Sequence, residues 1–341
     1  MSATNAWSGV RSLAAAVLGL VVMAVAGCSG NGGSAPPPSP LGQHARFYVD
    51  PAGHAVQAVG GLRAAGDRAQ AARLQKRIGS RSSARWLTDD PNAVYAEARK
   101  VSSAAGAHRA LPVLVAYDVP QRDCGGYSGG GASGVNAYLH WVGSLAAGIG
   151  RHRAVVVLEP DAVAHTLDGC LDPAAARERL RMLAQAVQIL KRQPRVRVYL
   201  DAGNASWVKD LDRLAAALRS AGVAKADGFS LNVSNFQSTA SSMRYGDRLS
   251  SRLGNAHYVV DTSRNGAGAP GGTVNPASNG AWCNPQGVRL GRPPTSDTGH
   301  ARVDAFLWVK QPGDSDGTCG AGAPPAGQWW PSFADRLMAG S

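Results

Sequence analysis

The stretch Val115-Ala-Tyr-Asp-Val-Pro-Gln-Arg-Asp-Cys124, followed by the glycine-rich run Gly125–Gly131, is the part of the chain around which the rest is organised. The apolar run Leu111–Tyr117 leads into it and predicts a buried strand. We expect this strand to end at Pro120, because proline has no N–H to donate to a neighbouring strand. The chain then turns into a loop of small residues.

Arg122, Asp123 and Cys124 stand side by side where this loop begins. A carboxylate and a guanidinium are costly to bury unless they are paired. The three residues therefore indicate either a salt bridge at a strand end, braced by a disulfide, or a functional site. Aspartates at the ends of three further predicted strands favour the functional site.

The overall charge is strongly positive. The chain has 341 residues, enough for one large domain or two ordinary ones, and a net charge of +12. Such a charge is typical of proteins with anionic partners, such as nucleic acid, acidic polysaccharide or a membrane surface. The arginines are nevertheless spread through predicted helices such as 172–193, with no run of Lys and Arg like a nucleic-acid-binding arm. We expect no nucleic-acid partner.

The N-terminus has the pattern of an export signal. Arg11 precedes an apolar core, Leu13–Ala26, which is shorter than the roughly 20 residues of a spanning helix. The segment ends Val-Ala-Gly-Cys28, which resembles the lipobox of bacterial lipoproteins, whose cysteine is lipidated and becomes the mature N-terminus. Cleavage nearby with ordinary secretion is the alternative. We expect residues 1–28 to be a signal peptide with a lipobox, and membrane contact only through a lipid on Cys28.

Two further segments complete the predicted domain organisation. Residues 29–43 are rich in Gly, Ser and Pro and predict a semi-extended tether, and residues 44–341 predict one folded domain. Cys28 is the odd one of five cysteines. In an exported chain the other four indicate two disulfides, with three possible connectivities; they are Cys124, Cys170, Cys283 and Cys319.

Seven apolar segments alternate with helical patterns along the predicted domain. Such alternation, with strands that are apolar almost throughout, predicts a parallel sheet covered by helices. The strand candidates are Ala84–Leu87, Leu111–Tyr117, Ala154–Leu158, Val196–Leu200, Gly228–Val233, His257–Asp261 and Ala305–Lys310. Helical patterns cover residues 54–78, 136–149 and 206–220. Two more helices are expected to begin at Asp-Pro pairs: one at Asp90-Pro91, and one at Asp172-Pro173 that runs to Arg192.

Acidic residues follow four of these strands at their carboxyl ends. They are Asp123, Asp161, Asp201 and Asp316. In a closed parallel barrel these ends meet on one face, where such folds place their active sites. An open doubly wound sheet would scatter them, so we expect a barrel of the TIM type. A dinucleotide-binding fingerprint is absent from the sequence, which argues against a nicotinamide enzyme.

Clustered carboxylates leave two main chemistries, a metal site or acid–base hydrolysis. Magnesium sites usually accompany a phosphorylated substrate, and the loop Gly125–Gly131 has no lysine beside it to hold phosphate. A Gly-x-Ser-x-Gly nucleophile motif is also absent from the sequence. Tryptophans near the strand ends suit either stacking on sugar rings or core packing; they are Trp86, Trp207, Trp282 and Trp308. The tryptophans favour a sugar substrate, and we expect neither a cofactor nor a metal.

Val115–Gly131 reads V-x-Y-x-x-P-x-R-D-C before its small-residue loop and resembles the signature of glycoside hydrolase family 6, cellulases that cut β-1,4-glucans with inversion. Glu159-Pro-Asp161 resembles the second signature of the family. The segments around Asp201, Trp282-Cys283 and Asp316 resemble further blocks. The resemblance covers roughly residues 47–337 and implies a distorted seven-stranded parallel β/α barrel.

The resemblance also implies roles for individual residues. Asp161 matches the general acid, Asp123 the acid that raises its pKa and orders water, and Asp316 the candidate general base. Asp201 and Arg122 match supporting charges, with Arg122 holding Asp123 in place, and Tyr117 lies under the distorted sugar. Three tryptophans match the residues on which sugar rings stack: Trp86, Trp207 and Trp282. Three polar residues match positions that form hydrogen bonds in the cleft: Asn235, Lys310 and Asp314. The implied disulfides are Cys124–Cys170 and Cys283–Cys319, each tying a site loop back on itself.

Two departures from the family bear on function. Asn204 stands where many members have histidine, at a position that touches sugar. The loops 162–169 and 317–328 are short, which favours an open cleft and internal cutting. We therefore expect a monomeric endo-1,4-β-glucanase. A cellobiohydrolase and a cell-surface glucan-binding lipoprotein without catalysis are the alternatives.

Overall fold

The computed structural model of the protein describes residues 39–88, 90–269, 282–319 and 322–339. The expected signal peptide, Cys28 and most of the tether lie outside these residues. Among the helices of the described part, none is both long and apolar enough to cross a membrane. The described residues belong to one compact unit.

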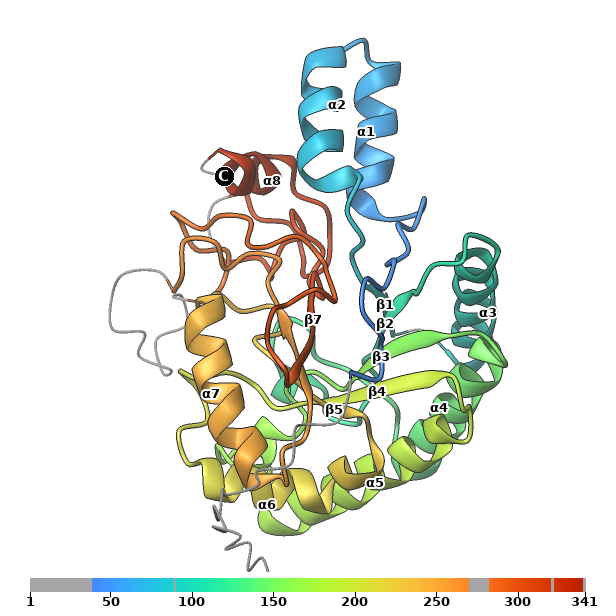
Figure 1. Ribbon diagram of the computed structural model, residues 1–341, viewed down its shortest axis with the longest axis vertical. Helices are drawn as coiled ribbons and strands as arrows, with labels where there is room; N and C mark the ends of the chain where they lie inside the picture. Colours follow the sequence, from blue (N-terminus) through green and yellow to red (C-terminus); the bar gives the residue numbers. More distant parts are fainter. Residues whose placement is uncertain (1–38, 89, 270–281, 320–321, 340–341) are drawn as a thin grey trace, which may run out of the picture. The chain divides into compact units, whose positions relative to one another are not determined.

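Seven parallel strands form a curled sheet in which each strand pairs with the next one along the chain (Figure 1). The strands are β1 (Arg85–Leu87), β2 (Val113–Ala116), β3 (Ala154–Leu158), β4 (Val196–Asp201), β5 (Gly228–Leu231), β6 (Tyr258–Asp261) and β7 (Val303–Leu307). Between the two edges, the backbone N–H of Ala84 donates to the carbonyl of Trp308 at 2.9 Å, beyond the end of the β7 ladder. The expected distorted barrel is confirmed.

Both faces of the sheet are buried, which explains the continuous apolar strands. In β3, Val155 and Val157 point into the barrel, where they pack with Tyr199. Val156 and Leu158 alternate with them and pack against the surrounding helices. Because every residue of the strand is enclosed, no polar residue can alternate with the apolar ones.

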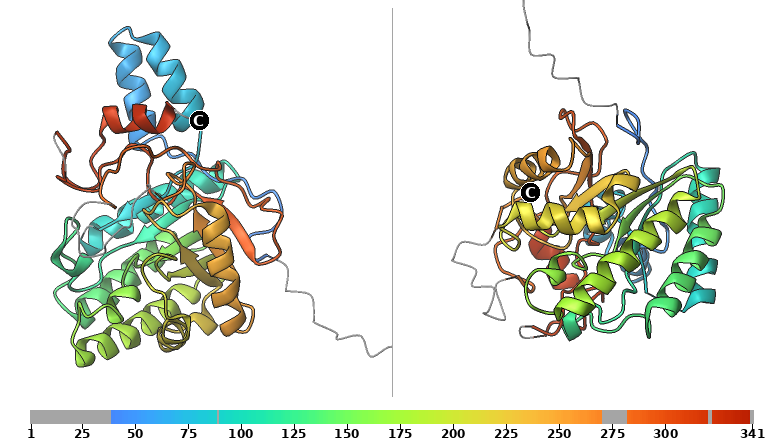
Figure 2. Two further views of the ribbon diagram at one scale, coloured as in Figure 1. Left: turned by 90° about the vertical axis from the view of Figure 1, so that its left-hand side faces the viewer. Right: turned by 90° about the horizontal axis from the view of Figure 1, so that it is seen from below.

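Helices α3 to α7 surround the sheet in Figure 1, and α1 and α2 form a hairpin beside α8 (Figure 2). Aspartates at the N-caps of α3 and α5 accept backbone N–H bonds, as the Asp-Pro starts predicted. The helices are α1 (His54–Ala64), α2 (Arg68–Leu74), α3 (Pro91–Ala107), α4 (Val135–Ile149), α5 (Pro173–Lys191), α6 (Leu211–Ser220), α7 (Thr239–Arg252) and α8 (Pro331–Met338).

Two of the helical patterns differ from the structure. The pattern 54–78 is interrupted at Gly66, whose φ of +86° ends α1, and Asp67 caps α2 through the N–H of Gln70. The helix expected from Ser206 begins only at Leu211, because Asp210 takes the N-cap position. In both cases a local capping interaction, and not the apolar periodicity, determines where the helix begins or ends.

The contact between α3 and α4 depends on a glycine. A Cβ added to Gly148 would lie 2.5 Å from the carbonyl oxygen of Tyr95 and 2.9 Å from the Cβ of Ala98. We predict that Gly148→Ala lowers the free energy of unfolding by about 1–3 kcal/mol, although alanine favours helix. Gly143 in the same helix has no atom within 4 Å of such a Cβ. Gly143→Ala should therefore leave urea-measured stability unchanged or higher, and equal losses in both variants would contradict this packing.

Candidate active site

The loops that follow the strands hold residues in a strained backbone conformation. Asp123, Cys124, Glu159 and Asp161 have φ values of +54°, +47°, +52° and +71°. Residues other than glycine seldom adopt the left-handed region, and such strain collects at functional sites when the surroundings impose it. The loops after β2 and β3 are therefore built to place particular side chains.

Asp161 and Asp201 form the centre of the site. The backbone N–H of Asp161 donates to Oδ2 of Asp201 at 2.9 Å, and that oxygen also accepts the N–H of Gly203 at 3.0 Å. The hydroxyl of Ser230 donates to Oδ1 at 3.1 Å. Asp201 is only 1% exposed. It is therefore a fully enclosed carboxyl that fixes the backbone beneath Asp161.

Burial raises the pKa of the Asp161 carboxyl to about 7, and the charge of Asp201 adds to this rise. His165 acts in the opposite direction, and Asp123 raises the pKa less than Asp201 does. Burial also raises the pKa of Asp201, to about 6. Burial and Asp201 thus raise the pKa of Asp161 more than Asp123 does, and the role of Asp123 in setting this pKa stays a prediction.

Asp123 is held by its own loop. Its Oδ2 accepts the backbone N–H of Ser128 at 2.7 Å. A Cβ on Gly126 would lie 2.7 Å from the same oxygen, so glycine is needed to leave room for the carboxylate. Ligand-type atoms of Asp123, Asp161 and His165 lie within 4.8 Å of one another. These three residues could hold a metal ion, and the expectation of no metal stays a prediction.

Arg122 does not pair directly with Asp123. Its guanidinium donates to the carbonyls of Tyr117 at 2.7 Å and Ser128 at 2.8 Å, and it lies 3.8 Å from the carboxylate of Asp118. It also lies 4.9 Å from the centre of the Tyr117 ring. Arg122 therefore supports Asp123 indirectly, by fixing the loop that carries Ser128.

Glu159 has a structural role. It is fully buried, and its carboxyl accepts the N–H groups of Asp118 and Val119 at 3.0–3.2 Å. Burial raises its pKa to about 7. Glu159 thus ties the loop after β2 to the end of β3, which brings Asp123 and Asp161 together.

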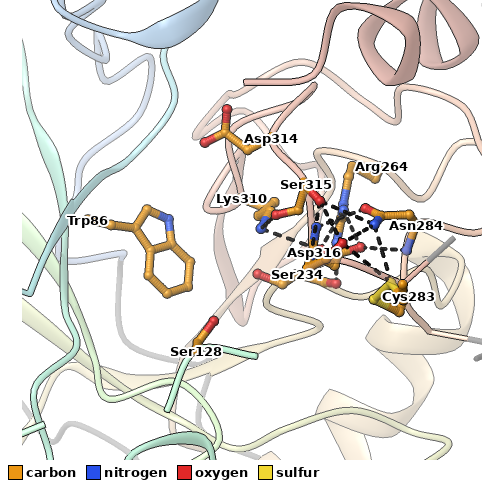
Figure 3. Close-up of polar contacts among 12 residues, drawn as sticks. Trp86, Ser128, Ser234, Arg264, Cys283, Asn284, Lys310, Asp314, Ser315 and Asp316 are labelled. Atoms are coloured by element: carbon orange, nitrogen blue, oxygen red, sulfur yellow. Dashed lines mark hydrogen bonds and ion pairs between the residues drawn. A yellow bond between two sulfur atoms is a disulfide. The ribbon is translucent and has the colours of Figure 1, made fainter. Parts of the chain in front are cut away.

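Asp316 lies in a separate polar network (Figure 3). Nη1 of Arg264 lies 2.9 Å from each oxygen of its carboxylate, Nζ of Lys310 lies 3.3 Å away, and the N–H of Asn284 donates at 3.0 Å. Arg264 is fully buried and stacks 4.4 Å from the centre of the Phe236 ring. Arg264 and Asn284 were not among the expected residues, because only the contact between the loops after β6 and β7 brings them to Asp316.

The tryptophans occupy different environments. Trp86 is half-buried, edge-on to Tyr117 at 5.1 Å, and donates to the carbonyl of Val309; Figure 3 shows it across the view from Lys310 and Asp316. Trp282 is 40% exposed. Trp308 is only 2% exposed and belongs to the core. For this tryptophan, core packing is therefore the correct prediction, and sugar stacking is not.

Trp207 contacts His165, a histidine that was not among the expected site residues. Its ring is half-buried and lies 4.9 Å from that of His165, whose Nδ1 is 2.9 Å from Asp168. The hydrogen bond with Asp168 raises the pKa of His165, against the effect of burial. A lone histidine in a short loop gave no signal in the sequence, because only the fold brings it to Asp161.

The expected hydrogen-bonding residues are engaged within the protein. Asn235 accepts the N–H of Phe236 at 2.9 Å, and Lys310 also donates to the carbonyl of Ser315 at 2.9 Å. Asp314 contacts Nδ1 of His54, the first residue of α1, at 2.8 Å. Their roles in sugar binding stay predictions. Asn204, the departure from the family pattern, accepts hydrogen bonds from Ser206.

The two implied disulfides are present, Cys124–Cys170 and Cys283–Cys319. The first joins the loop after β2 to the loop after β3, and the second joins the loops after β6 and β7. The expectation that each bridge ties one loop back on itself is therefore wrong. Each fixes two neighbouring loops relative to each other, because adjacent parallel strands end side by side.

Comparison with known proteins identifies relatives over most of the chain. The model of glycosyl hydrolases family 6 matches residues 42–341. Endoglucanase 1 of Streptomyces halstedii is 40% identical over 302 residues, which cover 86% of this chain and 88% of that protein. Endoglucanase A of Cellulomonas fimi is 41% identical over 293 residues, which cover 84% of this chain but 60% of that longer protein.

A solved structure shares the fold as well as the sequence pattern. It is an endoglucanase from Mycobacterium tuberculosis in complex with methyl-cellobiosyl-4-deoxy-4-thio-β-D-cellobioside. The TM-score is 0.79 at 40% identity, covering 87% of this chain and 98% of that one. Family model, relatives and fold agree with the resemblance first seen in Val115–Gly131, and together they show that this chain belongs to glycosyl hydrolases family 6.

Proposed function

We propose that the protein is an endo-1,4-β-glucanase that hydrolyses internal bonds of cellulose or related β-glucans with inversion. The observation that carries the proposal is the Asp161 carboxyl, whose pKa is raised to about 7 by burial and by Asp201. A carboxyl that keeps its proton near neutral pH can donate it to a leaving oxygen. The endoglucanases at about 40% identity support the same activity.

Asp123 and Asp316 are the carboxyl groups that we assign to the other steps of hydrolysis. Asp123 lies beside Asp161 with its Oδ2 on the N–H of Ser128, and we assign it to ordering the attacking water. Asp316 is the candidate base, and Arg264 and Lys310 fix its orientation. An inverting enzyme needs its acid and base on opposite faces of the sugar, with space for a water. The separate networks of Asp161 and Asp316 fit this division.

We also propose that the protein is exported as a monomer and carries a lipid on Cys28. The two disulfides favour an oxidising compartment outside the cytoplasm. The lipobox-like sequence before Cys28 favours the anchor over free secretion. Mass spectrometry of the mature N-terminal peptide tests this, and an unmodified terminus would exclude lipidation.

Product analysis tests the function as a whole. We expect carboxymethylcellulose and barley β-glucan to be cut to fragments of mixed length, with the α-anomer appearing first by NMR. A first product in the β-anomer would contradict inversion, and release of cellobiose alone would indicate a cellobiohydrolase. Binding without new reducing ends would indicate a glucan-binding protein.

Replacing the proton donor should separate activity from stability. Asp161→Asn is expected to lower the release of reducing ends by about 10²–10⁴-fold, because amide cannot supply the proton. Since the pKa of Asp161 is raised, its ionisation destabilises the fold progressively between pH of about 4 and about 7. The variant should match wild type at pH 4 and be more stable than wild type by up to about 4 kcal/mol at pH 8. Near-wild-type activity would show that the assigned acid is wrong.

A methyl group beside Asp123 tests its placement. Gly126 has extended backbone, with a φ of −70° and a ψ of −156°. A Cβ there would lie 2.7 Å from Oδ2 of Asp123 and 3.0 Å from the Asp123 carbonyl oxygen. Gly126→Ala should therefore push the Asp123 carboxylate aside and lower kcat by about 10- to 100-fold. Gly134→Ala, whose Cβ meets no atom within 4 Å, is the matched control. Unchanged kcat in both variants would remove Asp123 from the catalytic arrangement.

A further inference from the structure

The amino-terminal ends of β2, β3 and β4 bring arginines together at the end of the barrel opposite the carboxylates. Val113 pairs with Val155, and Ala154 pairs with Val196. This register places Leu111, Arg153 and Arg195 in a row across the three strands. With Arg197, these residues line a hollow of about 420 Å³. We call these four residues the basic mouth.

Across residues 39–88, 90–269, 282–319 and 322–339, the charges of the basic mouth are mostly uncompensated. Arg197 lies 3.2 Å from Asp227, but Lys191 shares that carboxylate. Among the residues that the structure describes, the guanidinium of Arg153 has one hydrogen bond, to the carbonyl of Leu41 at 3.4 Å. Within the described residues, no hydrogen bond or ion pair engages the guanidinium of Arg195. Arg153 and Arg195 directly precede the paired residues Ala154 and Val196. Like charges on neighbouring strands repel each other, so an anion from outside would relieve the repulsion.

The surrounding loops extend the positive surface. The stretches 106–112, 150–154 and 191–197 contain no aspartate or glutamate, and their remaining cations include Arg109, Arg151 and Arg192, all exposed. Cations at helix C-termini are favoured by the helix dipole, which accounts for Arg192 at the end of α5. The dipole does not account for Arg153 or Arg195, which directly precede strands.

The tether reaches the fold at this same end. Leu41 contacts Arg153, and Phe47 pairs with Leu111 just before β2. Cys28 precedes Leu41 by so few residues that an extended chain spans at most about 45 Å between them. A lipid on Cys28 would therefore hold Leu41, which lies at the same end of the barrel as the basic mouth, within about 45 Å of the membrane.

We propose that the basic mouth docks on the anionic phospholipid surface of the membrane to which the chain is tethered. The lipid phosphates supply the missing anions, and the docked domain presents its open site away from the membrane. The orientation rests on the proposed anchor at Cys28, because the tether raises the local concentration of the domain at the surface. A basic residue near such a surface contributes about 1 kcal/mol, roughly fivefold in binding.

The experiment uses residues 28–341 with Cys28→Ser, which contain the whole compact unit and no lipid. Co-sedimentation with phosphatidylcholine vesicles is compared with vesicles containing phosphatidylglycerol. We expect binding only to the anionic vesicles, weakening steeply as salt increases. Arg151→Gln, Arg153→Gln and Arg195→Gln together should weaken it by about 100-fold, with unchanged hydrolysis of carboxymethylcellulose.

The matched control removes the same charge from the α1–α2 hairpin, with Arg63→Gln, Arg68→Gln and Arg73→Gln. This variant should bind anionic vesicles like the parent. Equal binding to both vesicle types, or equal losses in the two triple variants, would overturn the proposal. Binding to a soluble acidic polysaccharide but not to vesicles would also overturn it. Because the chain carries no lipid, failure here is distinguishable from failure of lipidation at Cys28 or of catalysis.

Discussion

The backbone hydrogen bond from Asp161 to the buried carboxyl of Asp201 is the constraint on which the site depends. It joins the loop after β3 to the last residue of β4, and it places the half-buried carboxyl of Asp161 beside the buried carboxyl of Asp201, where neither ionises easily. Glu159 makes the equivalent connection to the loop after β2. The sheet is apolar on both faces, and burial of these apolar residues stabilises the fold. This stabilisation offsets the unfavourable free energy of burying carboxyl groups. The raised pKa of Asp161 is a consequence of this architecture.

The barrel separates two electrostatic environments. Carboxylates collect where the strands end, and arginines collect where β2, β3 and β4 begin. The net charge of +12 therefore does not describe the surface that meets substrate. A parallel barrel makes this separation possible because all its strands point the same way, so each end has its own loops. Chemistry at one end and attachment at the other can thus change independently.

Much of the fold was predictable, and the reason is physical. Each strand is enclosed on both faces, which leaves an uninterrupted apolar run in the sequence, and Asp201 and Asp161 stand at or just beyond such runs. The roles within the site were less predictable. Arg122 next to Asp123 suggested a direct pair, yet the guanidinium donates to the carbonyls of Tyr117 and Ser128 instead. His165, Arg264 and Asn284 join the site only through contacts between loops of different strands, which sequence order does not encode.

The central claim is that Asp161 keeps its proton near neutral pH. NMR titration of protein labelled with ¹³C at the aspartate carboxyls measures this directly, with Asp161→Asn assigning the resonance. The structure predicts a carboxyl that titrates at a pH of about 7 and disappears in the variant. If every aspartate titrates near its ordinary pKa of about 4, the enclosure does not hold the proton and the account of the site is contradicted.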